Sequence, residues 1–219
     1  MFNVKKIVIF FGVPGSGKGT QSKLLAKKFD YYHISTGDLF RRLESDEQAD
    51  VKDKEAAAII KSGSLAPSWL LYKLAFKEIE KALEEKGGVF LDGAVRSVEQ
   101  AEEFEKFFEK HGWQNDVLAM VLRLSDEEAF TRLTKRKICS QCGDIITWDK
   151  KLENVVRCKK CGGDLVVRTD DNPESAKTRL DLQGNKALDP ILDYYRKSGR
   201  LAGVDGAKTI KKINQELAF

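Results

Sequence analysis

Three groups of residues in this sequence have side chains and spacings suited to chemistry. A glycine-rich segment with one lysine, GVPGSGKGT, occupies positions 12–20. An aspartate and an arginine follow an apolar run in VFLDGAVR, at 89–96. Four cysteines fall between positions 139 and 161. These groups suit phosphate binding, paired charges at a reacting centre and metal binding, respectively.

The segment 12–20 is predicted to bind phosphate. Glycines let successive backbone N–H groups turn inward around phosphate oxygens, and the start of the following helix adds a favourable dipole. Lys18 can then reach the outer phosphates. Gly19 stands where the generic phosphate loop has Ser or Thr, so a hydroxyl contact to magnesium is less secure. The alternative, a turn that binds nothing, is disfavoured by the strand–loop–helix context. The predicted contacts are Gly15, Ser16, Gly17, Lys18, Gly19 and Thr20.

The cysteines form two Cys-x2-Cys pairs, Cys139/Cys142 and Cys158/Cys161, separated by fifteen residues. This spacing is typical of a four-thiolate zinc site. With four protein ligands the zinc would be structural, because no position stays open for a substrate. Two disulfides or free thiols are the alternative. Trp148, Lys150, Lys151 and Arg157 between the pairs also allow a nucleic-acid-binding ribbon, but we favour a solvated surface on a metal-stapled lobe.

Composition fits an ordinary globular protein. Of 219 residues, 42% are hydrophobic and 33% charged, with a formal net charge of +4 that suits anionic small molecules without requiring nucleic acid. No apolar stretch is long enough to span a membrane. The N-terminal run MFNVKKIVIFF is short, has no small-residue cleavage site and leads into the glycine segment, so we interpret it as a buried strand.

Alternating elements must position these groups. Near-continuous apolar strands are predicted at KKIVIFFG, YYHIS, GVFLD, DVLAMVLRL and LAGVDG. Helices are predicted between and after them, at 18–29, from Thr36, at 47–61, from Pro67, at 97–110, 126–136 and 173–198, and at KTIKKINQEL. This order predicts an α/β fold with a parallel sheet covered on both faces. The alternation stops between 137 and 172, which we interpret as an inserted β-rich module containing the cysteines.

Ordered motifs over most of the chain resemble the adenylate kinases, within the nucleoside monophosphate kinase family. The motifs are GVPGSGKGTQ, HISTGDLFR, LDGAVRSVEQA, RLTKRKICSQCG, VVRTDDNPESAKTRL and GVDG. The resemblance implies a P-loop NTPase-like core at 1–34, 67–134 and 173–219. It also implies a helical monophosphate-binding lobe at 35–66 and a zinc-bearing lid at 135–172. The implied activity is magnesium-dependent transfer of the terminal phosphoryl group of ATP to AMP, by a cytoplasmic monomer without a membrane or nucleic-acid partner.

The resemblance also assigns roles to residues. It implies that Asp92 holds magnesium through water and that Asp170 and Asp171 orient lid arginines. Arg132 and Arg136, expected on one helix face, could by themselves be a solvated surface, and Thr36 could simply cap a helix. The implied catalytic residues are Lys18, Arg96, Arg132, Arg168 and Arg179. The implied ATP contacts beyond the loop are Arg132, Arg136 and Gly203. The implied AMP contacts are Thr36, Arg41, Ser64, Leu65, Ala66, Gly93, Arg96, Gln100, Arg168 and Arg179.

Three departures from the family pattern stand out. Ala94-Val95 replaces Phe-Pro, which predicts a trans peptide and a weaker grip on the acceptor base. The lid lacks the usual paired prolines. After Arg179 the stretch DLQGNKALDP carries Gly184 and one extra residue, which predicts a kink. The alternatives to an ATP:AMP phosphotransferase are a kinase with a different or broader acceptor, a nucleotide-binding protein without turnover, and a zinc-ribbon nucleic-acid binder.

Overall fold

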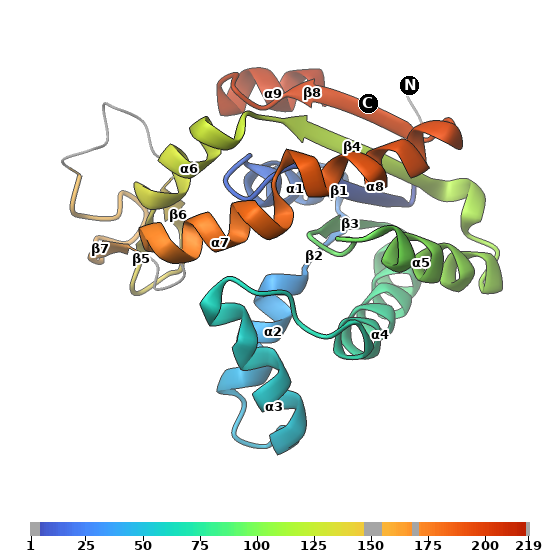
Figure 1. Cartoon of the computed structure of the whole chain (residues 1–219), viewed down its shortest axis with the longest axis horizontal. Helices are drawn as coiled ribbons and strands as arrows, with labels where there is room; N and C mark the ends of the chain where they lie inside the picture. The colour runs from blue at the N-terminus through green and yellow to red at the C-terminus, as the bar shows by residue number, and fades with distance from the viewer. Residues whose placement is uncertain (1–4, 147–154, 168–170, 218–219) are drawn as a thin grey trace.

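A computed structural model describes residues 5–146, 155–167 and 171–217 (Figure 1). Its centre is a five-stranded sheet in the order β2-β3-β1-β4-β8. Every neighbouring pair is parallel, so all the strands end at the same edge. The strands are β1 (Ile7–Phe11), β2 (Tyr32–Ser35), β3 (Val89–Asp92), β4 (Val117–Arg123) and β8 (Leu201–Asp205).

Helices cover both faces of this sheet, as its continuous apolar strands predict. Alternate residues of β1 face opposite sides. Ile7, Ile9 and Phe11 pack with α4 (Ser68–Lys86), α5 (Val98–Lys110) and α8 (Asn185–Lys197). Val8 and Phe10 pack with α1 (Lys18–Phe29) and α9 (Ile210–Glu216). The predicted α/β fold with a doubly covered parallel sheet is confirmed, and it is of the P-loop NTPase-like type.

Two insertions project from the sheet in different directions (Figure 1). The helical insertion contains α2 (Thr36–Ser45), α3 (Val51–Ala58) and the 3-10 turn η1 (Ile59–Ser62). The β insertion is an antiparallel sheet in the order β6-β5-β7, entered by α6 (Asp126–Thr134) and left by α7 (Pro173–Gln183). Its strands are β5 (Lys137–Cys139), β6 (Ile145–Ile146) and β7 (Leu165–Val167), and a further turn, η2, spans Gln114–Asp116 before β4.

Several predicted element boundaries need correction. The N-cap of α2 is Ser35, whose hydroxyl accepts a hydrogen bond from the Asp38 N–H at 3.3 Å, so the prediction that Thr36 caps this helix is wrong. Helix α6 ends at Thr134, which leaves Arg136 two residues beyond it and not on a shared helix face with Arg132. The helical stretch predicted at 173–198 consists of two helices, which are separated at the extended residue Gly184 (ψ −174°). The kink predicted there is confirmed.

No helix within the described ranges is both long and apolar enough to cross a membrane.

Candidate active site

A cavity of about 190 Å³ opens where β1 and β3 end, between the two insertions. Most of the predicted site residues line this cavity, although they are spread over more than 160 positions of the chain. They are Gly15, Gly17, Lys18, Gly19, Thr20, Thr36, Arg41, Ser64, Leu65, Ala66, Asp92, Gly93, Arg96, Gln100, Arg132, Arg136 and Arg179. Of the remaining predicted residues, Ser16 and Gly203 do not line it, and Arg168 lies outside the described residues.

The glycines of the phosphate loop are needed because neighbouring backbone comes very close. Gly12 and Gly15 have φ values of 143° and 88°, in the region that favours glycine. A Cβ at Gly12 would lie 2.7 Å from the Leu122 carbonyl oxygen, and one at Gly15 would lie 2.9 Å from that of Ala129. The Ser16 N–H donates to the Val13 carbonyl at 3.0 Å, which closes the turn before α1. The loop is therefore packed tightly between β4 and α6.

The position of Asp92 explains why Gly19 stands where the generic phosphate loop has Ser or Thr. A Cβ at Gly19 would lie 2.8 Å from Oδ2 of Asp92, so only glycine lets this carboxylate approach the first turn of α1 so closely. Asp92 ends β3 beside the end of β1, where its register partner is Phe10. The chain thus places a carboxylate next to the position that a side chain at residue 19 would occupy, and such an oxygen suits the water shell of magnesium.

Positive charge is concentrated and buried around this carboxylate. The pKa of Lys18 is lowered to about 8, chiefly by burial; Asp92 opposes this shift, and the nearby charges of Arg96, Arg179 and Arg136 add to it. Burial likewise lowers the pKa of Arg96, again against the effect of Asp92. Positive charge that is removed from water is costly unless an anion pairs with it. The cavity therefore suits a polyanion.

Thr36 of the helical insertion and Gln100 of α5 bring polar groups to the cavity, and hydrogen bonds orient both side chains. The Thr36 hydroxyl donates to the Gly93 carbonyl at 2.8 Å. Gln100 Oε1 accepts from the Arg96 N–H at 2.8 Å, and Gln100 Nε2 donates to Ser68 Oγ at 3.1 Å. The Ser68 contact was not predicted, since only packing of α4 against α5 brings it near. Thr36 and Gln100 therefore hold the turn at 93–96 as well as facing the cavity.

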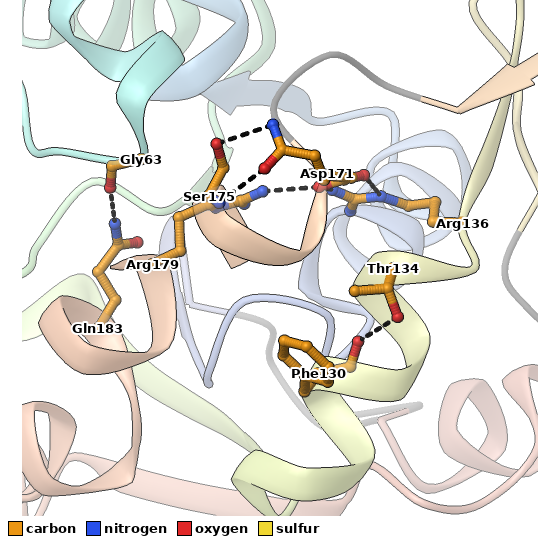
Figure 2. A network of polar contacts seen from close by, with 9 residues as sticks. Gly63, Phe130, Thr134, Arg136, Asp171, Ser175, Arg179 and Gln183 are labelled. Atoms are coloured by element: carbon orange, nitrogen blue, oxygen red, sulfur yellow. Dashed lines mark hydrogen bonds and ion pairs between the residues drawn. The ribbon is translucent and has the colours of Figure 1, made fainter. Parts of the chain in front are cut away.

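Two arginines at the start and end of the β insertion share one carboxylate (Figure 2). Asp171 is fully buried. It accepts from Arg136 Nε and Nη2 at 2.6 and 2.7 Å, and from Arg179 Nη1 at 2.8 Å. The prediction that Asp171 orients lid arginines is confirmed, whereas Asp170 lies outside the described residues.

Gly206, which sequence reasoning missed, lies closer to the phosphate loop than Gly203 does. Gly203 pairs with Val121 inside the sheet. The Gly206 carbonyl accepts from Arg132 Nη1 at 2.9 Å, and a Cβ at Gly206 would lie 3.4 Å from the Ser16 carbonyl oxygen. Arg132 is held from the other side by Glu128 at 2.6 Å. The second glycine of GVDG was the available signal.

The Ala94-Val95 pair is part of the core. Ala94 is fully buried and Val95 is 4% exposed. The described residues contain no cis peptide, so the predicted trans bond at Val95 is confirmed. Ala94 does not line the 190 Å³ cavity, whereas Val95 borders a small neighbouring cavity of about 30 Å³. The weaker grip on an acceptor base stays a prediction.

The four cysteines of the β insertion converge as a metal site requires. Their Sγ atoms all lie within 4.8 Å of one another. The Cys139–Cys161 and Cys142–Cys158 Sγ pairs are 3.4 and 3.8 Å apart. Tetrahedral zinc with bonds of about 2.3 Å would require roughly 3.8 Å. All four thiols are free, which contradicts the disulfide alternative. The donor set is therefore compatible with zinc.

Of the residues considered for a nucleic-acid surface, Arg157 lies within the described ranges. Trp148, Lys150 and Lys151 lie outside the described residues. Arg157 is exposed and pairs with Asp164 at 2.9 Å, as expected of a solvated surface.

Comparison with known proteins agrees with this geometry. The adenylate kinase family model matches residues 10–200. An adenylate kinase of Caldanaerobacter subterraneus subsp. tengcongensis is 37% identical over 214 residues, covering 96% of this chain and 93% of that protein. Adenylate kinases of a Thermoanaerobacter species and of Staphylococcus epidermidis are 36% and 35% identical, each over 96% of this chain, covering 95% and 96% of those proteins. Because both the family model and these relatives extend over nearly the whole sequence, this chain belongs to the adenylate kinase family.

Proposed function

We propose that this protein catalyses the reversible transfer of the terminal phosphoryl group of ATP to AMP, giving two ADP. The observation that carries this is the arrangement of Lys18, Arg96, Arg136 and Arg179 with Asp92 around one cavity at the sheet edge. An AMP phosphate oxygen attacks the γ-phosphorus of ATP as its bond to the β–γ bridging oxygen breaks, and ADP leaves. Such a transfer needs charge stabilisation and in-line positioning more than covalent help from the protein.

The two nucleotides would occupy opposite sides of the buried charge. The phosphate loop, Arg132 and Arg136 would hold ATP, with Gly206 added to the predicted contacts through its bond to Arg132. Thr36, Arg41, Gln100 and the backbone of 64–66 would hold AMP. Arg96 and Arg179, with Arg168 from the sequence prediction, would bridge the reacting phosphates. Arginine suits this role because its planar fork binds phosphate oxygens in pairs and stays charged.

Two metals belong to the proposal. Asp92 would hold magnesium through water beside Gly19, and that ion would neutralise charge on the β- and γ-phosphates. Cys139, Cys142, Cys158 and Cys161 would hold one structural zinc, which would make the small β insertion rigid.

We further propose that residues 35–66 and 135–172 act as separate lobes that close over the nucleotides. Closure would exclude water, which competes for the phosphoryl group and weakens electrostatic contacts. The contacts of both insertions with the cavity lining support this. Monomeric state and cytoplasmic location stay predictions.

The test is diphosphate formation from Mg-ATP with AMP, GMP, CMP, UMP and dAMP in parallel. We expect ADP formation with AMP, and a loss of about 100-fold or more in the Arg96→Ala variant. Lys106→Ala is the control, because Lys106 is an exposed lysine of α5 that pairs with Glu103 and does not line the cavity. No transfer to any acceptor would refute the kinase proposal, and preference for a pyrimidine would refute the AMP assignment.

A broader acceptor range is the second candidate, favoured by Ala94-Val95. An Ala94→Phe, Val95→Pro double variant tests it through the KM for AMP. We expect a lower KM if the small pair weakens the grip on the base. An unchanged KM in a folded variant would contradict that explanation, and the full burial of Ala94 makes thermal unfolding a necessary companion measurement.

A further inference from the structure

The helical insertion contacts helix α7 at a glycine. Gly63 ends η1 with φ 87° and ψ −4° and lies directly on α7. A Cβ there would come within 3.0 Å of both the Ser175 carbonyl oxygen and Cγ of Arg179, and within 3.4 Å of Cβ of Thr178. These three residues lie at spacings of three and four on one face of the helix. One turn further on, Gln183 Nε2 donates to the Gly63 carbonyl at 3.5 Å (Figure 2).

Arg179 is consequently held at two points. Its guanidinium is bonded to Asp171, which also holds Arg136 at the start of the β insertion. Its aliphatic stem lies against Gly63, at the end of the helical insertion. The Arg179 side chain is 18% exposed and lines the 190 Å³ cavity. Its direction is therefore set jointly by the two insertions.

We propose that Gly63 is a positioning residue for phosphoryl transfer. Its missing side chain lets the helical insertion seat on α7, and this seating fixes the stem of Arg179 so that the guanidinium faces the reacting phosphates. The inference rests on the proposed function and extends it. Gly63 itself needs no contact with a reacting atom, because it acts through Arg179.

The same contact links the two insertions. Asp171 holds Arg136 and Arg179 together, and Gly63 lies against Arg179 and accepts from Gln183 on the same helix. Displacement of the helical insertion from α7 releases the Arg179 stem while the Asp171 bond persists. Contact of the helical insertion with α7 therefore also fixes the direction of the Arg179 side chain. A displaced Gly63 consequently affects turnover as well as AMP binding.

The experiment compares Gly63→Ala with Gly87→Ala. Both glycines end a helical segment in the left-handed region, with φ values of 87° and 68° and ψ values of −4° and 4°. A Cβ at Gly87 would meet nothing within 4 Å. Both variants therefore bear a similar backbone strain, but only Gly63→Ala pushes against α7. Steady-state rates of ADP formation and thermal unfolding are measured for each.

We expect Gly63→Ala to lower kcat by about 10- to 100-fold and to raise the KM for AMP, because small misplacements are costly in transfer reactions. The KM for ATP should change less than about twofold. Gly87→Ala should lower only the melting temperature. Equal kcat values for the two variants would overturn the proposal. If Gly63→Ala does not fold, Gln183→Ala removes the 3.5 Å contact without strain and should lower kcat by a few-fold.

A double-mutant cycle with Arg179→Ala tests whether Gly63 acts through that side chain. In the Arg179→Ala background, Gly63→Ala should cost little further kcat. The same cycle is measured for the dissociation constant of AMP, by calorimetry without ATP. This measurement remains possible for variants that have little turnover. Additive effects in both measurements would overturn the inference and leave the kinase proposal intact. A wild-type protein that forms no ADP would instead refute the kinase proposal.

Discussion

At the residue scale, Asp92 affects the pKa of both Lys18 and Arg96. Burial lowers the pKa of both basic groups, and Asp92 opposes the shift in each. An incoming polyphosphate would favour the charged form of Lys18, as Asp92 already does. The lysine of the loop is therefore a proton-linked contact, while the arginines stay charged.

The pKa of about 8 for Lys18 predicts proton uptake on nucleotide binding. Below pH 8 the lysine is already charged, so ATP binding needs no proton there. Above pH 8 it is neutral in the free protein, and binding must recharge it. Affinity for Mg-ATP should fall as pH rises above 8, by at most about tenfold per pH unit. Calorimetry at pH 7 and pH 9, in buffers of different ionisation enthalpy, measures the protons taken up.

Lys18→Arg is the control for this prediction, because arginine does not titrate in this range. The variant should lose the uptake seen at pH 9 by the wild-type protein. Equal proton uptake by both proteins would show that another group is responsible.

At the scale of elements, the break between α7 and α8 contacts the start of α6. It thereby connects the helix that leaves the β insertion to the helix that enters it. Gly184 is extended, and Asn185 begins α8. Asp126, the first residue of α6, accepts from the Asn185 N–H at 3.1 Å and from Asn185 Nδ2 at 2.9 Å. Asn185 Nδ2 also donates to the Leu124 carbonyl at 2.9 Å. Both helices that lead to the β insertion are thus fastened at one joint.

Because of this joint, we expect Gly184→Ala to lower the free energy of unfolding, which is the opposite of the usual effect. Replacing glycine by alanine in a helical stretch normally stabilises by up to about 1 kcal/mol. Here a Cβ would come within 2.4 Å of the Leu180 carbonyl oxygen and 3.0 Å of Asp126 Oδ2. We expect a loss of about 1–3 kcal/mol in the free energy of unfolding, measured by urea titration. Gly37→Ala in α2 is the comparison, since the atoms nearest its Cβ belong to the flexible guanidinium end of Arg41, at 3.2–3.6 Å. A stabilising Gly184→Ala would contradict this account of the break.

At the scale of the whole molecule, a large sheet with two apolar clusters supports two small insertions. The β insertion has strands of only two or three residues. Such short strands cannot bury enough apolar surface to hold a fixed shape by themselves. We expect a metal held by the cysteine cluster, whose Sγ atoms lie within 4.8 Å of one another, to supply the missing constraint. Hydrogen bonds from the backbone N–H groups of Cys142 and Gln141 lower the pKa of the Cys139 thiol and favour the thiolate that binds metal, whereas the pKa of Cys142 is raised.

We accordingly predict about one zinc per chain by atomic spectroscopy. Removal of the metal by a chelator should lower the melting temperature and the rate of ADP formation, since Arg136 and Asp171 flank the β insertion. Cys142→Ser should reproduce both effects without chelator, whereas Lys159→Ala, at an exposed position between Cys158 and Cys161, should change neither. A metal-free protein with unchanged melting temperature would contradict the zinc assignment.

Much of the fold and site could be predicted because local patterns carry them. Apolar runs marked all five strands of the central sheet, and the GVPGSGKGT and Cys-x2-Cys spacings marked the loop and the cysteine cluster. The predictions were wrong where one of two similar residues in a motif had to be assigned a role. Ser35 and not Thr36 caps α2, and Gly206 and not Gly203 meets Arg132. In both cases neighbouring residues are chemically equivalent, and only packing against other elements chooses between them.

The sequence by itself determined which chemical groups the protein has and in which elements they lie, because periodicity and motif spacing act over short stretches of chain. The tertiary structure alone decided which of these groups meet. Asp92 approaches Gly19, Asp171 holds two arginines, and Gly63 lies on the stem of Arg179. These contacts join residues from separate elements, and their distances follow from how the helices and strands pack, which no local pattern specifies.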